Sequence, residues 1–198
     1  MCQSRGGAGR NVLVSLVLAL PFVAAAQAAS LEDEVNVLNQ AMGTCDYGPG
    51  NGPRTVRWGA NGGAATVLTG VSGFARNHGT ALNANGQIIG KYEGAGDFAN
   101  PFYWDPDAGT VVAIAPLPGG STCVATDLSD TSLVVGVSET FNGHAHAFEW
   151  TAAGGSVDLG VLSGGNNSAA GAISQNGQFA AGTSEGGTHI EHQVLINP

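Results

Sequence analysis

The sequence has few basic residues. Six lysines and arginines stand against fifteen aspartates and glutamates in 198 residues, so the formal net charge at pH 7 is −9. Such an acidic surface repels phosphate backbones and anionic lipid headgroups. We therefore expect no nucleic-acid partner. The charge bears on solubility and leaves the fold open.

Long apolar runs are equally scarce. One such stretch, residues 11–26, follows two arginines, is interrupted by Pro21 and ends at the small-residue triplet Ala26-Gln27-Ala28. It is shorter than the roughly 20 residues that a spanning helix needs. A basic start, an apolar centre and a small-residue exit are typical of a secretory signal peptide. We predict that residues 1–28 are removed on export, that the mature protein is secreted, periplasmic or extracellular, and that it has no stable membrane span.

The chain has only three cysteines, and Cys2 lies in the predicted signal peptide. Cys45 and Cys123 remain, and an oxidising compartment would allow them to form a disulfide. That bridge would close a loop of about 80 residues and contribute ~4 kcal/mol. The alternative stays open, because two small buried thiols are also ordinary core residues.

Helical periodicity is almost absent after residue 45, whereas the chain has 32 glycines. Two kinds of landmark recur instead, and each recurs every 46 residues (104 − 58 and 150 − 104 for tryptophan; 136 − 90 and 182 − 136 for glycine). A shared period of this size indicates an internal structural repeat. The landmarks are Trp58, Trp104 and Trp150, and Gly90, Gly136 and Gly182.

Each repeat contains about four short extended segments. In "HAFEW" the apolar residues Phe148 and Trp150 alternate with polar ones, which is typical of a strand with one buried face. Asn-Gly pairs at 85–86 and 176–177 supply turn residues that tolerate positive φ. The equivalent strands are expected at Arg54–Trp58, Asn100–Trp104, His146–Trp150 and His192–Ile196.

Four short strands in 40–50 residues have the size of one β-propeller blade. We predict an all-β fold of tandem four-stranded antiparallel repeats, partial and β-propeller-like, with a β-solenoid as the alternative. Because a ring needs 4–8 blades, open sheet edges should allow self-association, unless the chain is part of a larger array. The expected units are 54–99, 100–145, 146–191 and the start of a fourth at 192–198, all in one domain, 54–198. Residues 29–53 are expected to form a lead-in with a partial repeat. A helix is the alternative there, because Leu31, Val35, Leu38 and Met42 also fit a helical stripe.

One repeat carries a family resemblance. His146-Ala147-Phe148 is followed by Trp150, Asp158-Leu159-Gly160 and Gly182-Thr183-Ser184, and residues 142–186 as a whole resemble the HAF-repeat family of bacterial extracellular proteins. The likeness is weaker over residues 54–141. It implies export and a repetitive β-fold, and it provides no catalytic residues.

Histidine is the candidate metal ligand. His144 and His146 share one side of a strand, and His192 lies 46 residues after His146, so three imidazoles are candidates for zinc or copper. The equivalents of His146 are Arg54 and Asn100, which indicates a scaffold position that needs any polar side chain. We therefore expect no bound metal and no cofactor, and a hydrogen bond from His146 to the adjacent loop backbone.

The pattern of acidic residues is more typical of turns than of a metal-binding or catalytic site. Asp105 and Asp107 in "WDPDAGT" lack the further oxygen ligands that calcium needs and are common turn formers. A Gly-x-Ser-x-Gly motif is absent, so nothing indicates a nucleophilic serine. We expect a non-catalytic repeat scaffold that binds an extracellular polymer or protein, or has a structural role, with loops at 77–80, 118–123 and 163–168 on one face. The alternative is a carbohydrate- or polymer-active enzyme that uses loop carboxylates, for which Asp127 and Asp130 are the candidates.

Overall fold

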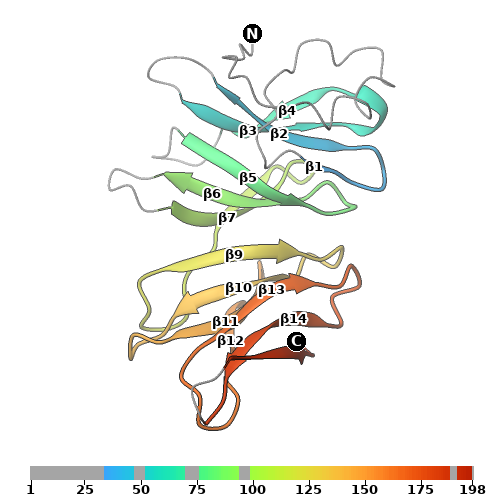
Figure 1. Ribbon diagram of the computed structural model, residues 1–198. Coiled ribbons are helices and arrows are strands. Elements are labelled where there is room, and N and C mark those ends of the chain that lie inside the picture. The colour runs from blue at the N-terminus through green and yellow to red at the C-terminus, as the bar shows by residue number, and fades with distance from the viewer. Residues whose placement is uncertain (1–33, 47–51, 70–75, 94–98, 188–190, 198) are drawn as a thin grey trace, which may run out of the picture.

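The protein folds as a series of small antiparallel sheets. The computed structural model describes residues 34–46, 52–69, 76–93, 99–187 and 191–197. The predicted signal peptide, residues 1–28, and parts of the predicted lead-in lie outside them. Within the described residues there are fifteen strands in four sheets, with one short 3-10 helix (η1, Ala60–Gly62) and no α-helix. The sheets follow one another through the molecule in chain order (Figure 1). The expected all-β fold is confirmed.

Each sheet is a meander in which every strand pairs with its neighbour in the sequence. This pairing excludes the β-solenoid alternative, because strands of a solenoid pair with the equivalent strand of the next coil. The sheets pack face to face, as blades do, so the fold is propeller-like. Sheet A contains β1 (Glu34–Val35), β2 (Ala41–Asp46), β3 (Pro53–Trp58) and β4 (Ala65–Val67); sheet B contains β5 (Arg76–Leu82), β6 (Ile88–Glu93), β7 (Ala99–Asp105) and β8 (Thr110–Ala113). Sheet C contains β9 (Cys123–Leu128), β10 (Val134–Glu139), β11 (Ala145–Thr151) and β12 (Gly155–Gly160); sheet D contains β13 (Ser168–Ile173), β14 (Ala180–Glu185) and β15 (Glu191–Ile196).

The equivalent strands are where the alternation predicted them, as the third strand of each sheet: β3, β7 and β11, which carry the tryptophans, and β15, which ends at Ile196. A unit that begins at such a strand therefore contains the end of one sheet and the start of the next. The lead-in supplies the first two strands of sheet A, β1 and β2, so the helical alternative is wrong for residues 34–46.

Apolar residues form a separate core between each pair of sheets. Each sheet has a trailing face, toward the preceding sheet, and a leading face, toward the following one. Ile89 of sheet B and Val134 of sheet C are both fully buried in one such core. The three cores are Met42 and Leu68 against Leu82, Ile88, Tyr92, Phe102 and Trp104; Ile89, Tyr103, Ile114 and Leu117 against Cys123, Ala125, Leu128, Val134, Phe148 and Trp150; and Val135 and Ala147 against Ala170 and Ala180.

The recurring glycines lie where two strands approach too closely for a side chain. Gly136 on β10 pairs with Phe148 on β11, and a Cβ at Gly136 would collide with the carbonyl oxygen of Val124 on β9. Gly90 stands in the same relation to Phe102, and its Cβ would collide with the carbonyl oxygen of His78. The first strand of each sheet carries a bulge beside the glycine in sheets B, C and D. The 46-residue period of glycine thus has a steric cause.

Turns between the first and second strands link successive sheets at one end of the molecule, the turn end. Nδ2 of Asn83 donates to the carbonyl of Ser129, 46 residues away, at 2.8 Å. Nδ2 of Asn36 likewise donates to the carbonyl of Asn83 at 2.7 Å, and the amide of Asp130 donates to the carbonyl of Gln175 at 2.8 Å. The opposite end, the connector end, carries the segments that lead from one sheet into the next.

Aspartates stabilise the turn between β7 and β8, as expected. Oδ1 of Asp105 accepts hydrogen bonds from the amides of Asp107 and Ala108, and Asp107 forms an ion pair with Arg57 of sheet A in which Nη2 and Oδ1 are 2.6 Å apart. Burial opposes ionisation of Asp105, but the hydrogen bonds from Ala108, Gln87 and Asp107 and the charge of Arg57 outweigh it and lower the pKa of its carboxyl.

Candidate functional site

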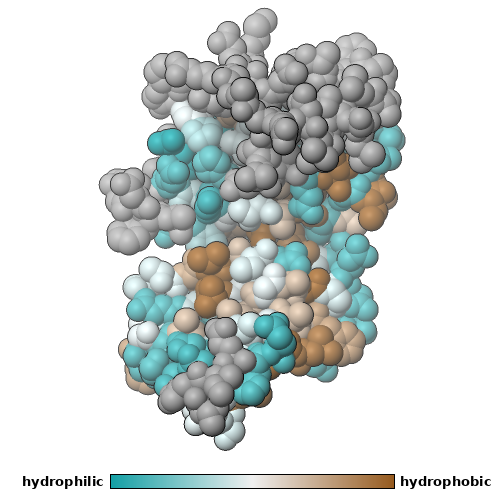
Figure 2. Space-filling model, viewed as in Figure 1, coloured by the Kyte–Doolittle hydropathy of each residue, from teal (hydrophilic) through white to brown (hydrophobic). Residues whose placement is uncertain are grey.

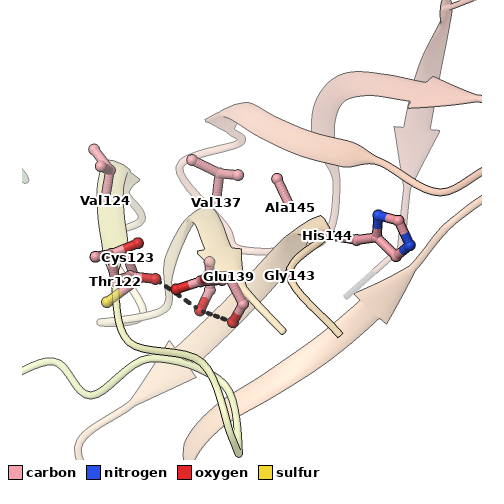
Figure 3. A pocket seen from close by; sticks show the side chains of 9 residues that line it. Thr122, Cys123, Val124, Val137, Glu139, Gly143, His144 and Ala145 are labelled. Carbon is pink, nitrogen blue, oxygen red and sulfur yellow. Dashed lines mark hydrogen bonds between the residues drawn. The ribbon is translucent and has the colours of Figure 1, made fainter. Parts of the chain in front are cut away.

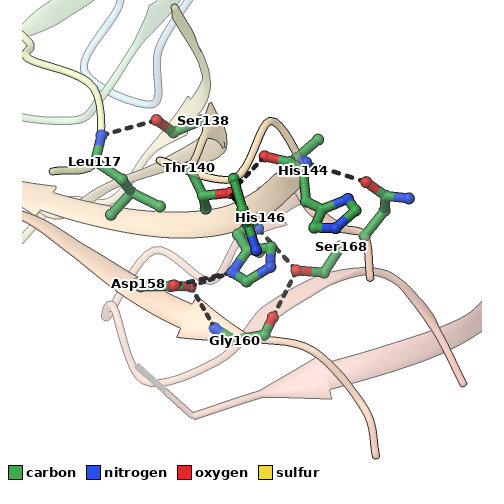
Figure 4. A network of polar contacts seen from close by, with 12 residues as sticks. Leu117, Ser138, Thr140, His144, His146, Asp158, Gly160 and Ser168 are labelled. Atoms are coloured by element: carbon green, nitrogen blue, oxygen red, sulfur yellow. Dashed lines mark hydrogen bonds and ion pairs between the residues drawn. The ribbon is translucent and has the colours of Figure 1, made fainter. Parts of the chain in front are cut away.

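The three candidate histidines do not converge. His146 lies on β11 and His192 at the equivalent place on β15, in different sheets, while His144 lies in the turn before β11. Nδ1 of His146 donates to the carboxylate of Asp158 on β12, with Oδ2 at 2.9 Å (Figure 4). The partner is thus a neighbouring strand's carboxylate instead of the loop backbone that the sequence suggested. Among the residues that the structure describes, no three His, Cys, Asp or Glu side chains lie close enough together to hold a metal ion.

The His-Ala-Phe triplet joins sheet C to sheet D. The amide of Ala147 donates to Oγ of Ser168, the first residue of β13, at 2.8 Å, and the hydroxyl of Ser168 donates to the carbonyl of Gly160 at 2.5 Å. The amide of Gly160 in turn donates to Asp158 at 2.7 Å (Figure 4). Ser168 is buried and bonded to backbone groups, so these residues form a structural link.

The same link recurs between the other sheets with different side chains. Between sheets A and B, the amide of Thr55 donates to Oδ1 of Asn77 at 2.7 Å. Between sheets B and C the donor position is Pro101, which has no amide hydrogen, and the acceptor position is Cys123. The thiol of Cys123 donates to the carbonyl of Ile114 at 3.6 Å, as Ser168 does to Gly160. Cys123 is a weak hydrogen-bond acceptor, and the residue opposite it, Pro101, has no amide hydrogen to donate.

Of the two alternatives for Cys45 and Cys123, the disulfide is not formed, because Cys123 is a free, buried thiol. The physical reason is topological: Cys45 lies on β2 of sheet A, Cys123 begins β9 of sheet C, and the whole of sheet B separates them. Burial raises the pKa of the Cys123 thiol to about 11. It is therefore protonated at neutral pH and is a poor nucleophile.

The carboxylates considered for catalysis face different sheets. Oδ2 of Asp127 accepts a hydrogen bond from the amide of Ile173 in sheet D at 2.8 Å. Oδ1 of Asp130 accepts one from the amide of Ala84, in the turn of sheet B, also at 2.8 Å. A glycosidase needs two carboxylates that flank one bond. Asp127 and Asp130 instead hold the sheets on either side of sheet C.

Sequence reasoning missed a third acid, Glu34 on β1. Its Oε2 accepts a hydrogen bond from the amide of Leu82 in sheet B at 2.6 Å, just as Asp127 does from sheet D. Burial raises the pKa of Glu34, the bond from Leu82 opposes that rise, and the charge of Asp127 adds to it. Glu34 and Asp127 are 93 residues apart (127 − 34), close to two repeats, and Ala81 occupies the position between them. That spacing was the available signal.

A shallow depression of about 310 Å³ opens at the connector end of sheet C. Val124, Val137 and Ala145 project from three neighbouring strands to the same side (Figure 3). Its lining also includes the titratable side chains of Glu139, His144 and Cys123. The hydroxyl and the amide of Ser121 both donate to Glu139, and these bonds lower the pKa of its carboxyl. Glu139 is thus already engaged with the connector.

The connectors are held in register by equivalent glutamates. Glu139 accepts from the amide of Ser121, and Glu185 accepts from the amide of Asn166. The loops expected at 118–123 and 163–168 thus do occupy matching places before β9 and β13. The segment 77–80 does not, because it lies inside β5. Within it Gly79 pairs with Gly90 of β6, and the bulge follows at Thr80.

Apolar side chains on the face seen in Figure 2 occur in separate patches between polar ones. Within the part of the chain described, no helix has the length and apolar character needed to cross a membrane.

No family model and no curated protein sequence matches the chain. Among solved structures, it is similar to TolB from Acinetobacter baumannii, with a TM-score of 0.54 and 12% identity over 84% of this chain and 40% of that chain. A gluconolactonase from Xanthomonas campestris gives a TM-score of 0.40 and 13% identity over 84% of this chain and 61% of that one, a similarity too low to argue from. The chain thus spans less than two thirds of either structure. The likeness to TolB supports the propeller-like fold and nothing further.

Proposed function

We propose that the protein is an exported, non-catalytic repeat scaffold of the HAF-repeat type, which presents its connector end to an extracellular ligand. The signal-peptide pattern of residues 1–28 and the resemblance of residues 142–186 support export. The periplasm or the extracellular space is the proposed location.

One observation supports the non-catalytic role: the candidate acids Asp127 and Asp130, and Glu34 with them, are hydrogen-bonded to backbone amides of neighbouring sheets. Asp127 bonds to Ile173, Asp130 to Ala84 and Glu34 to Leu82. His146 is likewise paired with Asp158 within its own sheet. Side chains whose hydrogen bonds join one sheet to another are poorly placed to exchange protons with a substrate.

The connector end is the proposed display surface. Its connectors are fixed by Glu139 and Glu185, so they offer a rigid arrangement that loses little entropy on binding. The depression beside His144 lies at this end.

A panel of extracellular polysaccharides and surface proteins, assayed separately for binding and for hydrolysis, tests this proposal. We expect no hydrolysis, and binding that His144→Ala weakens. The matched control is Asn176→Ala, an exposed substitution in the turn between β13 and β14 at the opposite end of the molecule. Hydrolysis that Asp127→Asn abolishes would refute the proposal and favour the carboxylate enzyme.

A further inference from the structure

Among the described residues, no further sheet packs on the outer faces of sheets A and D, the first and last of the series. Inside the molecule, the leading face of sheet B packs on the trailing face of sheet C. Tyr103 and Trp150 meet there with ring centroids 5.5 Å apart and planes tilted by 47°. Both side chains are buried, with 5% and 3% of their surface exposed. This pair shows what normally covers each face.

The leading face of sheet D has the same positions without a cover among the described residues. Leu195 lies on β15 where sheet B has Tyr103, and it is 71% exposed. Its cross-strand partner Ala181 is also exposed, whereas the equivalent residues Ile89 and Val135 are fully buried in sheets B and C. An apolar side chain on such a face is costly to leave in water.

The trailing face of sheet A is its counterpart. Trp58 on β3 pairs with Ala41 as Trp104 pairs with Ile88 and as Trp150 pairs with Val134. Trp104 and Trp150 are each 3% exposed, whereas Trp58 is only partly buried. A tryptophan that would accept an apolar neighbour thus stands at one end, and a leucine that would provide one stands at the other.

We propose that two copies associate head to tail, with the leading face of sheet D of each copy packed on the trailing face of sheet A of the other. Leu195 then contacts Trp58 of the second copy as Tyr103 contacts Trp150 within one copy. Two copies bring eight sheets, which is within the 4–8 blades of closed propellers. A twofold axis makes both contacts equivalent and closes the ring. The contact uses sheet faces, in place of the strand edges that the sequence suggested.

Sedimentation and light scattering of the purified full chain over a wide concentration range test the proposal. We expect a dimer, and we expect Leu195→Asp to weaken it about 100-fold, because a carboxylate would be buried without a partner. Leu195 is exposed, so the variant should keep its circular dichroism spectrum. The matched control is Phe141→Ser, which alters a side chain that is 82% exposed in the turn between β10 and β11, away from both end faces. It should leave the dimer unchanged.

A mixing experiment tests the head-to-tail geometry. Leu195→Asp and Trp58→Asp should each be monomeric alone, because every interface then contains one altered residue. A mixture of the two restores one intact contact, between Leu195 of one variant and Trp58 of the other, so dimers should reappear. A monomeric wild type, a dimer that survives Leu195→Asp, a mixture that stays monomeric, or growth beyond two copies would each overturn the proposal.

Discussion

Replacing Gly136 with alanine should destabilise the protein far more than the same change at Gly171, a strand glycine where a Cβ would meet no clash. A Cβ at Gly136 would collide with the carbonyl oxygen of Val124 and lie 2.8 Å from Cε1 of Phe148. Because the obstacle is backbone, β9 must shift from β10. Overpacking of this kind costs about 1–3 kcal/mol, and a strained or lost ladder hydrogen bond adds about 1 kcal/mol. We expect a loss of about 3 kcal/mol in the free energy of unfolding.

Urea denaturation followed by tryptophan fluorescence measures this loss, with Gly171→Ala as the control. Gly171 occupies a bulge on β13, requires no left-handed backbone, and a Cβ there would have its nearest neighbour, the carbonyl oxygen of Ala181, at 3.8 Å. That substitution should change stability by no more than about 0.5 kcal/mol. Thermal unfolding should show a loss of roughly 6–12 °C for Gly136→Ala. Equal stability of the two variants would refute the steric explanation of the glycine period.

Three further predictions concern titratable groups. Burial raises the pKa of Glu34 above its ordinary 4.5, so ionisation of Glu34 opposes folding. The stability of the wild type relative to Glu34→Gln should therefore be highest below pH 4.5 and should fall as the pH rises through the folded-state pKa. Urea titrations at a series of pH values would measure this difference. The Cys123 thiol, with a pKa of about 11, should react with a thiol reagent at about pH 8 only after unfolding; immediate reaction in the native protein would contradict its burial. A double-mutant cycle of Arg57→Ala and Asp107→Ala should give a coupling below about 1 kcal/mol, because Asp107 is 65% exposed; a coupling of several kcal/mol would contradict that screening.

The sequence was sufficient to locate the third strand of each sheet. Period-two alternation ending in tryptophan is a local signal, and it survives because these residues fill the cores between sheets. The same tryptophan signal does not mark where a sheet begins. Trp104 and Trp150 mark strands in the middle of a sheet, so units counted from them begin halfway through one sheet and end halfway through the next.

The links between sheets could not be predicted in the same way, because their chemistry varies while their geometry is constant. Asn77, Cys123 and Ser168 occupy one position of the repeat, and no residue-type pattern connects them. The absence of a donor at Pro101 explains why a cysteine is tolerated in the middle sheet. The sequence alone therefore leaves two interpretations of Cys123 open, a disulfide with Cys45 and a buried thiol, and the structure shows the buried thiol.

The contacts of the candidate acidic residues were equally hard to predict from the sequence. Asp127 and Asp130 were singled out because they are close in sequence, but successive strand and turn positions point toward different neighbours. Glu34 escapes the pattern because the glycine of sheet A, Gly43, lies 47 residues before Gly90 instead of 46 (90 − 43), so the first strand falls out of the period. Its relation to Asp127 becomes clear once β1 is recognised as a first strand.

Site-specific amide hydrogen exchange is the most direct test of the claim that polar side chains hold the sheets together. The amides of Ala147 and Ile173 donate to Ser168 and Asp127 in the adjacent sheets. We predict that both are strongly protected in the native protein, and that Ser168→Ala accelerates exchange at Ala147 while Ile173 stays protected. Rapid exchange at both amides in the wild type would contradict the claim.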